Sequence, residues 1–415
     1  MKIIYITVAI PFGNREAFVL SEIEELLSGG NSIKIVPLNP REAVTHGNAL
    51  PLLQHTARQD VVSPAILGSA LRIALRYPLR TLAAAACLLQ SRSLKILAKN
   101  LVVFPKALWV AKLAEEFGAE HIHAQWAGCS STLAFVASRV TSIPWSFTAH
   151  RWDIPENNLL RLKIASAAFA RGIDEDGVAE LRRCAQGYAD RVVLLHIGVK
   201  IPTAARKPDE NGGNFRILVP GFLVPKKGHT YMIGALRILA SRGVAVHADF
   251  AGEGPLEDEI RAQLINAGLQ DKVNLLGLAA HDELMRGLAQ GRWDAVVLPS
   301  IMENGHKEGI PVSLMEAMSC YIPVISTETG GIPELLRGGA GLLVPERDAE
   351  ALANAIQRLI SDTGLYKTLA TAGRTRVEEG FAVAATIREF LSLIVRANGN
   401  SHGSRERQQS LGLVP

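Results

Sequence analysis

Short runs of β-branched and apolar residues alternate with helical segments along most of the chain, and this alternation is the strongest constraint on its fold. In the first half, the runs predicted to be strands are KIIYITVA (2–9), SIKIVPL (32–38), HIHAQWA (121–127), IPWSFTAH (143–150) and RVVLLHIGV (191–199). In the second half, they are FRILVPGF (215–222), VAVHADFAG (244–252), VNLLG (273–277), DAVVLPS (294–300), YIPVIST (321–327) and GGAGLLVP (338–345). Strands that alternate with helices in this way form parallel sheets with helices on both faces.

The alternation and the length of the chain together predict two α/β domains. The chain has 415 residues, more than one core usually organises, and the Pro-, Gly- and polar-rich segment 200–214 is typical of an interdomain linker. We therefore expect one Rossmann-like, doubly wound parallel sheet in residues 1–199 and a second in residues 215–380. A helix over 381–398 is expected to pack back on the first domain, and residues 399–415 are expected to form a loose tail.

Two open α/β domains joined by one linker are expected to face each other across a central cleft. In open parallel sheets, ligands bind beyond the carboxyl ends of the strands. Candidate site residues should therefore follow predicted strands.

The segment EGIPVSLMEAM (308–318) places two carboxylates in an apolar run that follows a predicted strand. Gly309 permits unusual backbone angles and Pro311 suits a helix start, so the next amides should lack partners and attract an anion. Glu308 would stand beside that anion, and Glu316 would reach back from the helix. This pattern fits a phosphate with a hydroxylated group on either side. The alternative is that Glu308 is only a helix-start charge and Glu316 a surface residue.

Lys226 and Lys227 follow the first strand of the second domain, in VPGFLVPKKGH (219–229). Their ammonium groups can approach the same phosphate. The alternative is that the two lysines simply face water, as paired lysines often do. The nearby helix start is what favours a role in phosphate binding. The turn AGEGPLEDE (251–259) lacks the third glycine of a dinucleotide fingerprint and is rich in acids, so nicotinamide binding is rejected there.

In the first domain, Gly13 and Asn14 follow the first strand, where a flexible turn lets amides approach a ligand; a plain tight turn is the alternative. His150 and Asp153 follow another predicted strand, and a histidine there can bond a sugar hydroxyl or be purely structural. His123 shares a strand face with a second histidine. Two histidines without a third ligand are poor evidence for a metal site, so no metal is expected and His123 is assigned a structural role near the cleft.

The stretch from Val61 to Ala114 contains no acidic residue. Its basic residues are Arg72, Arg76, Arg80, Arg92, Lys95, Lys99, Lys106 and Lys112. Cations at helical spacing among apolar residues are typical of an amphipathic insert on an anionic membrane surface. The alternative is a helical insert whose basic residues are simply solvated. Aromatic residues do not interleave with the cations as they do in single-strand nucleic-acid binders, so nucleic acid is not expected as a partner.

No apolar run reaches the length that spans a bilayer. The opening MKIIYITVAIPFG is interpreted as a buried strand rather than a signal peptide because it lacks a small-residue cleavage site. The four cysteines are scattered, which favours a reducing, cytoplasmic compartment over a disulfide framework.

Taken in order, several motifs resemble those of a known family. They are GFLVPKKGH, AGEGPL, VNLLG, EGIPVSLMEAMSCYIPVIST, GGIPEL and GLLVPERDAEALANAI in the second half, and PFGNREAFVLSEIEEL, HIHAQWA and SIPWSFTAHRWDI in the first. This set resembles the retaining GT-B glycosyltransferases of family four, in the bacterial branch that builds exopolysaccharide, capsule and lipopolysaccharide. The resemblance covers essentially the full chain, and the two glutamates with the intervening Gly-x-Pro are its most specific part.

The resemblance implies transfer of a hexose from a UDP- or GDP-sugar to a glycan acceptor that is lipid-linked, with no cofactor and no catalytic metal. It implies that Glu308 holds the donor sugar, Glu316 the ribose, and Lys227 the diphosphate, with His150 bonding the transferred sugar. The residues implied to contact the rest of the donor are Gly13, Lys226, Leu276, Gly277, Gly309, Ile310, Pro311, Val312 and Ser313. Asp153, His123 and Asn14 are assigned to the acceptor side. Retention would follow from attack on the same face as the leaving phosphate.

This chain departs from the family pattern at several positions. Phe222 stands where relatives usually have an arginine, which removes one diphosphate cation. His196 and Lys200 replace a common Asn and Asp, Gln125 replaces a histidine, and FARGIDEDG (169–177) replaces a serine at a helix start. Two alternatives therefore stay open: a sugar-nucleotide epimerase, which would need no acceptor, and a non-catalytic binding protein of the same fold.

Overall fold

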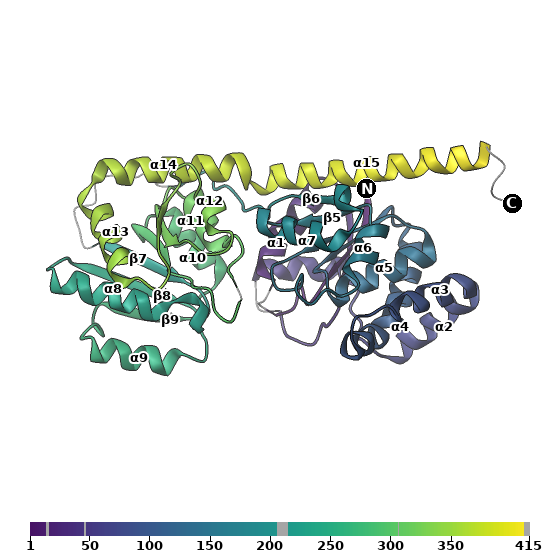
Figure 1. Ribbon diagram of the computed structural model, residues 1–415, viewed down its shortest axis with the longest axis horizontal. Coiled ribbons are helices and arrows are strands. Elements are labelled where there is room, and N and C mark those ends of the chain that lie inside the picture. Colours follow the sequence, from purple (N-terminus) through teal and green to yellow (C-terminus); the bar gives the residue numbers. More distant parts are fainter. Residues whose placement is uncertain (14–15, 45–46, 206–214, 306, 411–415) are drawn as a thin grey trace. The chain divides into compact units, whose positions relative to one another are not determined.

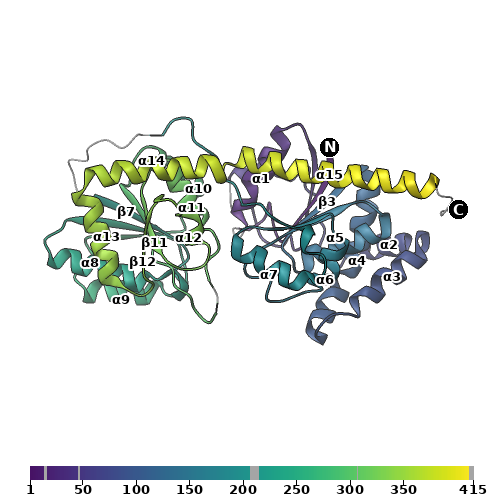
Figure 2. The ribbon, with the colours of Figure 1, turned by 45° about the horizontal axis from the view of Figure 1, so that its top comes forward.

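The computed structural model describes residues 1–13, 16–44, 47–205, 215–305 and 307–410. The chain forms two compact units, each described here by itself. Unit 1 comprises Met1–Ile197 and the chain from Ala384 onward, and unit 2 comprises Gly198–Val383. Figures 1 and 2 show one sheet in each unit with helices on both faces.

Unit 1 contains a parallel six-stranded sheet in the order β2-β1-β3-β4-β5-β6. Its strands are β1 (Lys2–Thr7), β2 (Ser32–Pro37), β3 (His121–Gln125), β4 (Trp145–Ala149), β5 (Phe169–Gly172) and β6 (Val192–Leu194). Every residue of β3 and β4 is buried, as expected for central strands covered on both faces. The helices that cover this sheet are α1 (Ala17–Ser28), α5 (Cys129–Thr141), α6 (Leu160–Ser166) and α7 (Glu175–Ala185).

Unit 2 contains a second parallel six-stranded sheet, in the order β12-β11-β10-β7-β8-β9. Its strands are β7 (Phe215–Pro220), β8 (Val246–Ala251), β9 (Val273–Gly277), β10 (Ala295–Leu298), β11 (Val324–Thr327) and β12 (Leu342–Val344). Its helices are α8 (His229–Ser241), α9 (Glu257–Asn266), α10 (His281–Ala289), α11 (Val312–Ser319), α12 (Ile332–Leu335), α13 (Ala349–Ser361) and α14 (Thr363–Gly380). Numbered from β7, this is the doubly wound order 3-2-1-4-5-6, which reverses between β7 and β10. Two Rossmann-like parallel-sheet domains are therefore confirmed.

The stretch without acids folds as three helices, α2 (Pro64–Arg76), α3 (Pro78–Leu88) and α4 (Leu94–Phe117). Serine side chains at positions 63 and 93 cap α2 and α4 by accepting from backbone amides. Figures 1 and 2 show the three helices together beside α5. Pro78 starts a new helix and so separates Arg80, on α3, from Arg72 and Arg76, on α2.

Lys106 also departs from the expected basic face, because its side chain is fully buried. Its ammonium donates to the carbonyl oxygens of Pro37 (2.7 Å), Leu38 (2.9 Å) and Gln59 (2.7 Å). Burial lowers its pKa to about 8. Among the described residues, no helix is both long enough and apolar enough to cross a membrane.

The final helix, α15 (Val383–Ser410), contributes to unit 1. The buried ring of Phe390 lies 4.7 Å from the ring of His123 and 5.9 Å from that of Phe169, measured between centroids. The helix continues to Ser410, beyond the end expected near Asn398. Extending an existing helix needs no apolar face, because each added residue forms one more backbone bond.

Candidate functional site

Three side chains that follow neighbouring strands converge at the carboxyl edge of the unit 2 sheet. Lys226 and Lys227 lie in a short 3-10 turn after β7, and Glu308 lies in the loop after β10. Strands β7 and β10 are adjacent, and the sheet order reverses between them. This is the position at which open α/β sheets bind ligands.

Glu308 binds both lysines. Its carboxylate lies 3.1 Å from Nζ of Lys227 and 3.3 Å from Nζ of Lys226, and it accepts a hydrogen bond of 3.3 Å from Oγ of Ser300. Burial raises the pKa of Glu308, but the two ammonium groups outweigh that effect and hold the pKa below its ordinary value. Burial lowers the pKa of Lys226, with Glu308 acting in the opposite direction. The result is a mostly buried cluster with two cations and one anion.

Glycines allow the loops around this cluster to pack closely. Gly228 has φ +69°, and a Cβ there would lie 1.9 Å from the carbonyl oxygen of Pro299, beyond β10. Gly330 has φ +56°, and a Cβ there would lie 1.7 Å from the carbonyl oxygen of Glu308. The amide of Gly331 donates to that same oxygen at 3.1 Å. A side chain at position 228 or 330 would therefore displace the backbone that holds Glu308 and the lysines.

The helix α11 begins four residues after Glu308, at Val312. Gly309 and Ile310 lead to the N-cap, Pro311, and the helix starts at Val312. Amides in the first turn, such as those of Val312 and Ser313, have no partner within the helix. They supply partial positive charge beside the lysine cluster.

Glu316, from the second turn of α11, contacts a different group. Its carboxylate lies 2.6 Å from Nε2 of His281, the first residue of α10. The hydrogen bond to Glu316 raises the pKa of His281 above its ordinary value. Leu276 and Gly277 end β9, and Leu276 packs against the apolar cluster that Val312 also contacts. Among the described residues, Glu308 and Glu316 share no hydrogen-bond partner.

In unit 1, His150 follows β4 and is buried. Its Nε2 lies 3.0 Å from Oε1 of Gln125, and its ring centroid lies 4.2 Å from that of Trp126. Burial, and next the charge of Arg171, lowers the pKa of His150 to about 3, so the ring is neutral near pH 7. The amide of His150 donates to Asp153 at 2.9 Å.

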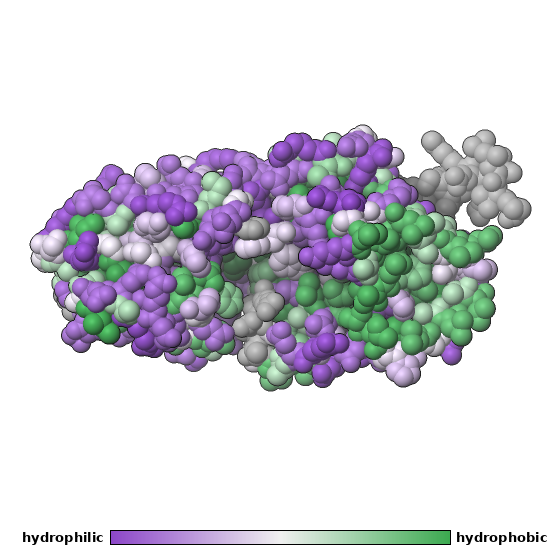
Figure 3. All heavy atoms as spheres, turned by 60° about the horizontal axis from the view of Figure 1, so that its bottom comes forward, coloured by the Kyte–Doolittle hydropathy of each residue, from purple (hydrophilic) through white to green (hydrophobic). Residues whose placement is uncertain are grey.

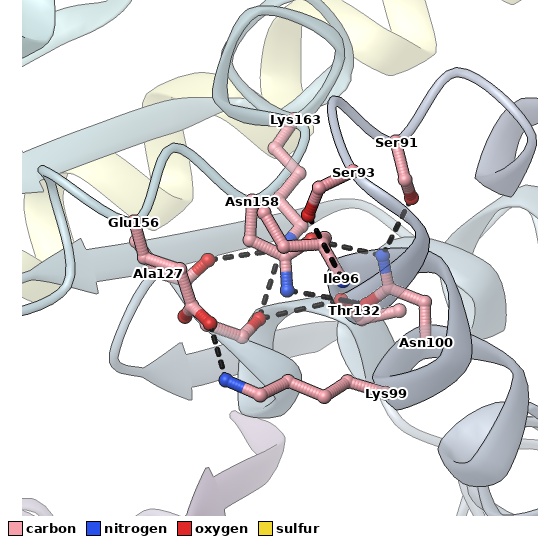
Figure 4. A network of polar contacts seen from close by, with 11 residues as sticks. Ser91, Ser93, Ile96, Lys99, Asn100, Ala127, Thr132, Glu156, Asn158 and Lys163 are labelled. Carbon is pink, nitrogen blue, oxygen red and sulfur yellow. Dashed lines mark hydrogen bonds and ion pairs between the residues drawn. The ribbon is translucent and has the colours of Figure 1, made fainter.

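Asp153 holds two backbone segments together by accepting from the amides of Ala127 and His150. Burial raises its pKa to about 7, although both amides act in the opposite direction. Lys163 lies close by and donates to the carbonyl oxygens of Ala127 (2.9 Å) and Gly128 (2.8 Å), as Figure 4 shows. These contacts fix the loops that follow β3 and β4.

The other predicted residues of the first domain differ in their surroundings. His123 is buried, with Nδ1 at 2.8 Å from Oγ of Ser146 and Nε2 at 3.1 Å from Oγ1 of Thr148. Gly13 has φ +71°, and its amide donates to the carbonyl oxygen of Ala43 at 2.9 Å. Asn14 lies outside the described residues. His123 lies within β3 and His150 follows the neighbouring strand β4, whereas Gly13 lies in the loop after β1.

Several polar or aromatic residues near these sites were missed by the sequence analysis. Glu16 accepts from the amides of the loop after β1 and from Nε1 of Trp126 at 2.6 Å. Trp126 has φ +73°, rare for a residue with a side chain and typical of functional sites. Trp152 is 53% exposed beside His150. Trp126 directly follows β3 and Trp152 lies three residues after β4, and this position after a strand is the signal that could have found them. The contacts of Glu16 with Trp126 and of His281 with Glu316 join distant segments and leave no such signal.

Within the described residues, no group of three or more His, Cys, Asp or Glu side chains is arranged to hold a metal ion. Two ammonium groups and the first amides of α11 are groups that can hold an anion, and a carboxylate such as that of Glu308 can accept from hydroxyl groups. The fold is that of a two-domain α/β protein with these groups at the carboxyl edge of its second sheet.

Comparison with known proteins assigns the second domain to a family. Residues 200–376 match the model of the family described as glycosyl transferases group 1. The amylovoran biosynthesis glycosyltransferase AmsK of Erwinia amylovora is 37% identical over 183 residues, which cover 44% of each chain. The putative colanic acid biosynthesis glycosyltransferase WcaL of Escherichia coli is 34% identical over 209 residues, 49% of this chain and 51% of that protein.

The matches thus span about half the length of these curated relatives. A structural likeness covers more of the chain. The Anabaena protein Alr3699/HepE, solved in complex with UDP, aligns with a TM-score of 0.69 at 19% identity, over 95% of this chain and 100% of that one. Sucrose-phosphate synthase from Thermosynechococcus elongatus aligns with a TM-score of 0.67 at 18% identity, over 95% of this chain and 99% of that one. Both sheets therefore belong to the GT-B fold that the motifs predicted.

Proposed function

We propose that this protein is a retaining glycosyltransferase that transfers a hexose from a UDP- or GDP-sugar to a glycan acceptor. The observation that carries the proposal is the cluster of Lys226, Lys227 and Glu308 beside the start of α11, at the point where the sheet order reverses. The group 1 domain supports it, as do the relatives named for amylovoran and colanic acid biosynthesis. By analogy with those relatives, the product belongs to a cell-surface polysaccharide.

The donor diphosphate would become the partner of the lysines. Glu308 pairs with both ammonium groups and leaves one positive charge uncompensated, so a diphosphate that binds the lysines would free the carboxylate to accept from hydroxyl groups of the donor sugar. The amides of residues 309–313 would bind the same diphosphate. Glu316 would accept from the ribose, and the backbone at Leu276 and Gly277 would contact the base.

Transfer breaks the bond between the sugar C1 and the diphosphate oxygen and forms a bond from C1 to an acceptor hydroxyl oxygen. The acceptor proton passes to the leaving phosphate, which lies on the same face of the sugar and so preserves the configuration at C1. Lys227 and the helix amides stabilise the negative charge that grows on the diphosphate. This charge stabilisation is proposed to operate without a metal ion or another cofactor.

Residues of unit 1 are assigned to the transferred sugar and the acceptor. His150 is neutral near pH 7, so one ring nitrogen can donate to or accept from a sugar hydroxyl. Asp153 accepts from the backbone amides of Ala127 and His150 and so positions the loop that contains His150. We assign Asp153 to the acceptor side. His123, Asn14 and Gly13 keep their predicted roles, with Gly13 assigned to the donor.

The acceptor is proposed to be lipid-linked, and the protein is proposed to work on the inner, cytoplasmic face of the plasma membrane. The four cysteines are free thiols, as a reducing compartment would maintain them. The insert of residues 61–114 contains no acid and is the proposed contact with anionic membrane.

The proposal is tested by screening nucleotide sugars with a lipid-pyrophosphate acceptor and detecting products by mass spectrometry. Glu308→Gln keeps the shape of the side chain but removes its charge, and should reduce kcat by about 100-fold or more. Glu379→Gln, an exposed change on α14, is the matched control and should leave kcat unchanged.

Three outcomes would overturn the proposal. Unchanged turnover in Glu308→Gln would show that the carboxylate has no role in transfer. A sugar-nucleotide product formed without any acceptor would identify an epimerase. The absence of heat on titration with UDP and with GDP would indicate a protein that does not use these donors.

A further inference from the structure

An unusual number of leucine side chains are exposed on the helices of the insert. Leu67, Leu71 and Leu75 are spaced four residues apart on α2, so they share one face of the helix, and they are 50%, 62% and 73% exposed. On α3, Leu79 is 80% exposed and Leu82 is 67% exposed. We define the leucine surface as Leu67, Leu71, Leu75, Leu79, Leu82, Leu89 and Leu94, all of them exposed.

The leucine surface is additional to the face that packs the insert onto unit 1. Helix α2 already buries Ile66, Ala70 and Ile73, and α3 already buries Ala84 and Leu88. Figure 3 shows hydrophobic side chains gathered over the side of unit 1 that carries α2, α3 and α4. A helix with two apolar faces normally has both faces packed against other groups. Apolar surfaces of this extent mark interaction sites.

The charges around the leucine surface restrict what can cover it. Arg72, Arg92 and Lys95 are exposed, and no acid lies between residues 61 and 114. Two other cations are already paired: Arg76 lies 3.3 Å from Glu115, and Lys99 lies 2.5 Å from Glu156. The surface is therefore mainly apolar with a few cations, and the acids of these helices, Glu115 and Glu116, lie at the far end of α4 and pair with Arg76 and Lys112.

We infer that the leucine surface enters the interfacial region of a lipid bilayer with anionic headgroups. Leucines would reach the boundary of the acyl chains while Arg72, Arg92 and Lys95 contact phosphate groups, as in helices that lie on membranes. A second copy of this chain fits less well, because a two-fold contact would bring the same cations together without acids to offset them. This inference rests on the proposed membrane contact of residues 61–114, and assigns the main attraction to leucines rather than to the basic residues.

The test uses the full chain and vesicles of phosphatidylcholine with about one third phosphatidylglycerol, with binding measured by flotation. The wild type should float, and a substantial part of the binding should persist at about 0.5 M salt, where exposed charges are screened. The double variant L71S/L79S should lower the partition coefficient by about tenfold or more. Ile265→Ser removes a 66% exposed side chain from α9 of unit 2 and is the matched control, which should float like the wild type.

A charge variant separates the two contributions. Replacement of Arg72, Arg92 and Lys95 by glutamine should remove the salt-dependent part of binding and leave the salt-resistant part. The inference is overturned if the wild type does not float, if L71S/L79S floats as well as the wild type, or if binding vanishes at high salt. It is also overturned if light scattering shows a wild-type dimer that L71S/L79S converts to monomer. Calorimetry with UDP and GDP reports the donor site separately, so loss of flotation with intact nucleotide binding leaves the proposed transferase in place.

Discussion

At the scale of residues, the proposed donor site depends on charged side chains that pair with one another. Glu308 keeps its charge in a mostly buried place because two ammonium groups lie within 3.3 Å. Removal of one partner of a buried pair leaves the other charge uncompensated, which costs more than the pair itself contributes. A glutamine at position 308 should therefore weaken the packing of Lys226 and Lys227 as well as the proposed contact with the sugar.

The contact between His281 and Glu316 predicts a dependence of stability on pH. The hydrogen bond to Glu316 raises the pKa of His281 above 6.5, its ordinary value. The stabilisation is therefore complete below pH 6.5 and is lost as pH rises through the raised pKa of the folded state. Because the histidine is partly exposed, the effect should be below about 1 kcal/mol. Urea unfolding between about pH 6 and about pH 8.5 measures it.

His281→Gln is the control for this dependence, since glutamine can still bond Glu316 but does not titrate. The variant should lose the decrease in unfolding free energy that the wild type shows above pH 6.5. Identical pH profiles for the two proteins would contradict the assignment.

At the scale of elements, a buried polar network joins the insert to the loops of the unit 1 sheet. Asn100 of α4 donates to Oγ of Ser91 (3.1 Å) and to Oδ1 of Asn158 (2.9 Å), and it accepts from Oγ1 of Thr132 at 2.9 Å. Lys99 reaches Glu156 in the same region, as Figure 4 shows. The network connects α4 with α5 and with the segment between His150 and α6.

Asn100→Ala should destabilise unit 1 by about 1–3 kcal/mol, because it removes both side-chain hydrogen bonds of the buried Asn158 and one of those made by Thr132. Lys99→Ala is the matched comparison on the next residue. It breaks an exposed ion pair, and should cost less than about 1 kcal/mol. Chemical unfolding monitored by tryptophan fluorescence measures both. Equal effects of the two substitutions would show that the network does not hold these elements together.

The same elements show which parts of the fold could be predicted from the sequence. Runs such as those of β1 (KIIYIT) and β10 (AVVL) are recognisable because β-branched and apolar residues predominate in each. Strand β5 was missed because it contains Arg171, which a one-dimensional pattern assigns to the surface. In the structure, Arg171 is buried because it lies 2.7 Å from Glu22 and donates to the carbonyl oxygen of Leu195.

The candidate site was predictable where polar residues follow a strand or start a helix. Glu308 and the two lysines satisfy both criteria, and the structure brings their charged groups together. His281 could not be predicted, since its contact with Glu316 spans 35 residues. Lys106 was predicted to be exposed because it shares the helical spacing of the other cations. Its ammonium is instead buried, where it donates to three backbone carbonyl oxygens.

At the scale of the whole molecule, each unit has its own hydrophobic core. One core cluster contains buried residues between Ile4 and Val192, and the two others contain residues between Val199 and Phe381. The ends of unit 2 are tied to each other, because the amide of Val199 donates to Phe381 at 2.8 Å and that of Val383 donates to Val199 at 2.9 Å. Unit 2 is thus a continuous segment with a closed core, whereas unit 1 is completed by α15.

Residues 198–383 should therefore fold when expressed alone, with one cooperative unfolding transition and binding of UDP or GDP like that of the full chain. Residues 1–197 alone should not, because they lack the buried side chains of Ile387, Phe390 and Ile394, of which Phe390 packs against the rings of His123 and Phe169. Loss of one large buried side chain costs about 3–5 kcal/mol, a large share of the stability of a domain. Circular dichroism and calorimetry on the two fragments measure the difference. If 198–383 is unfolded, or folds without binding either nucleotide while the full chain binds, the donor site cannot be complete within unit 2.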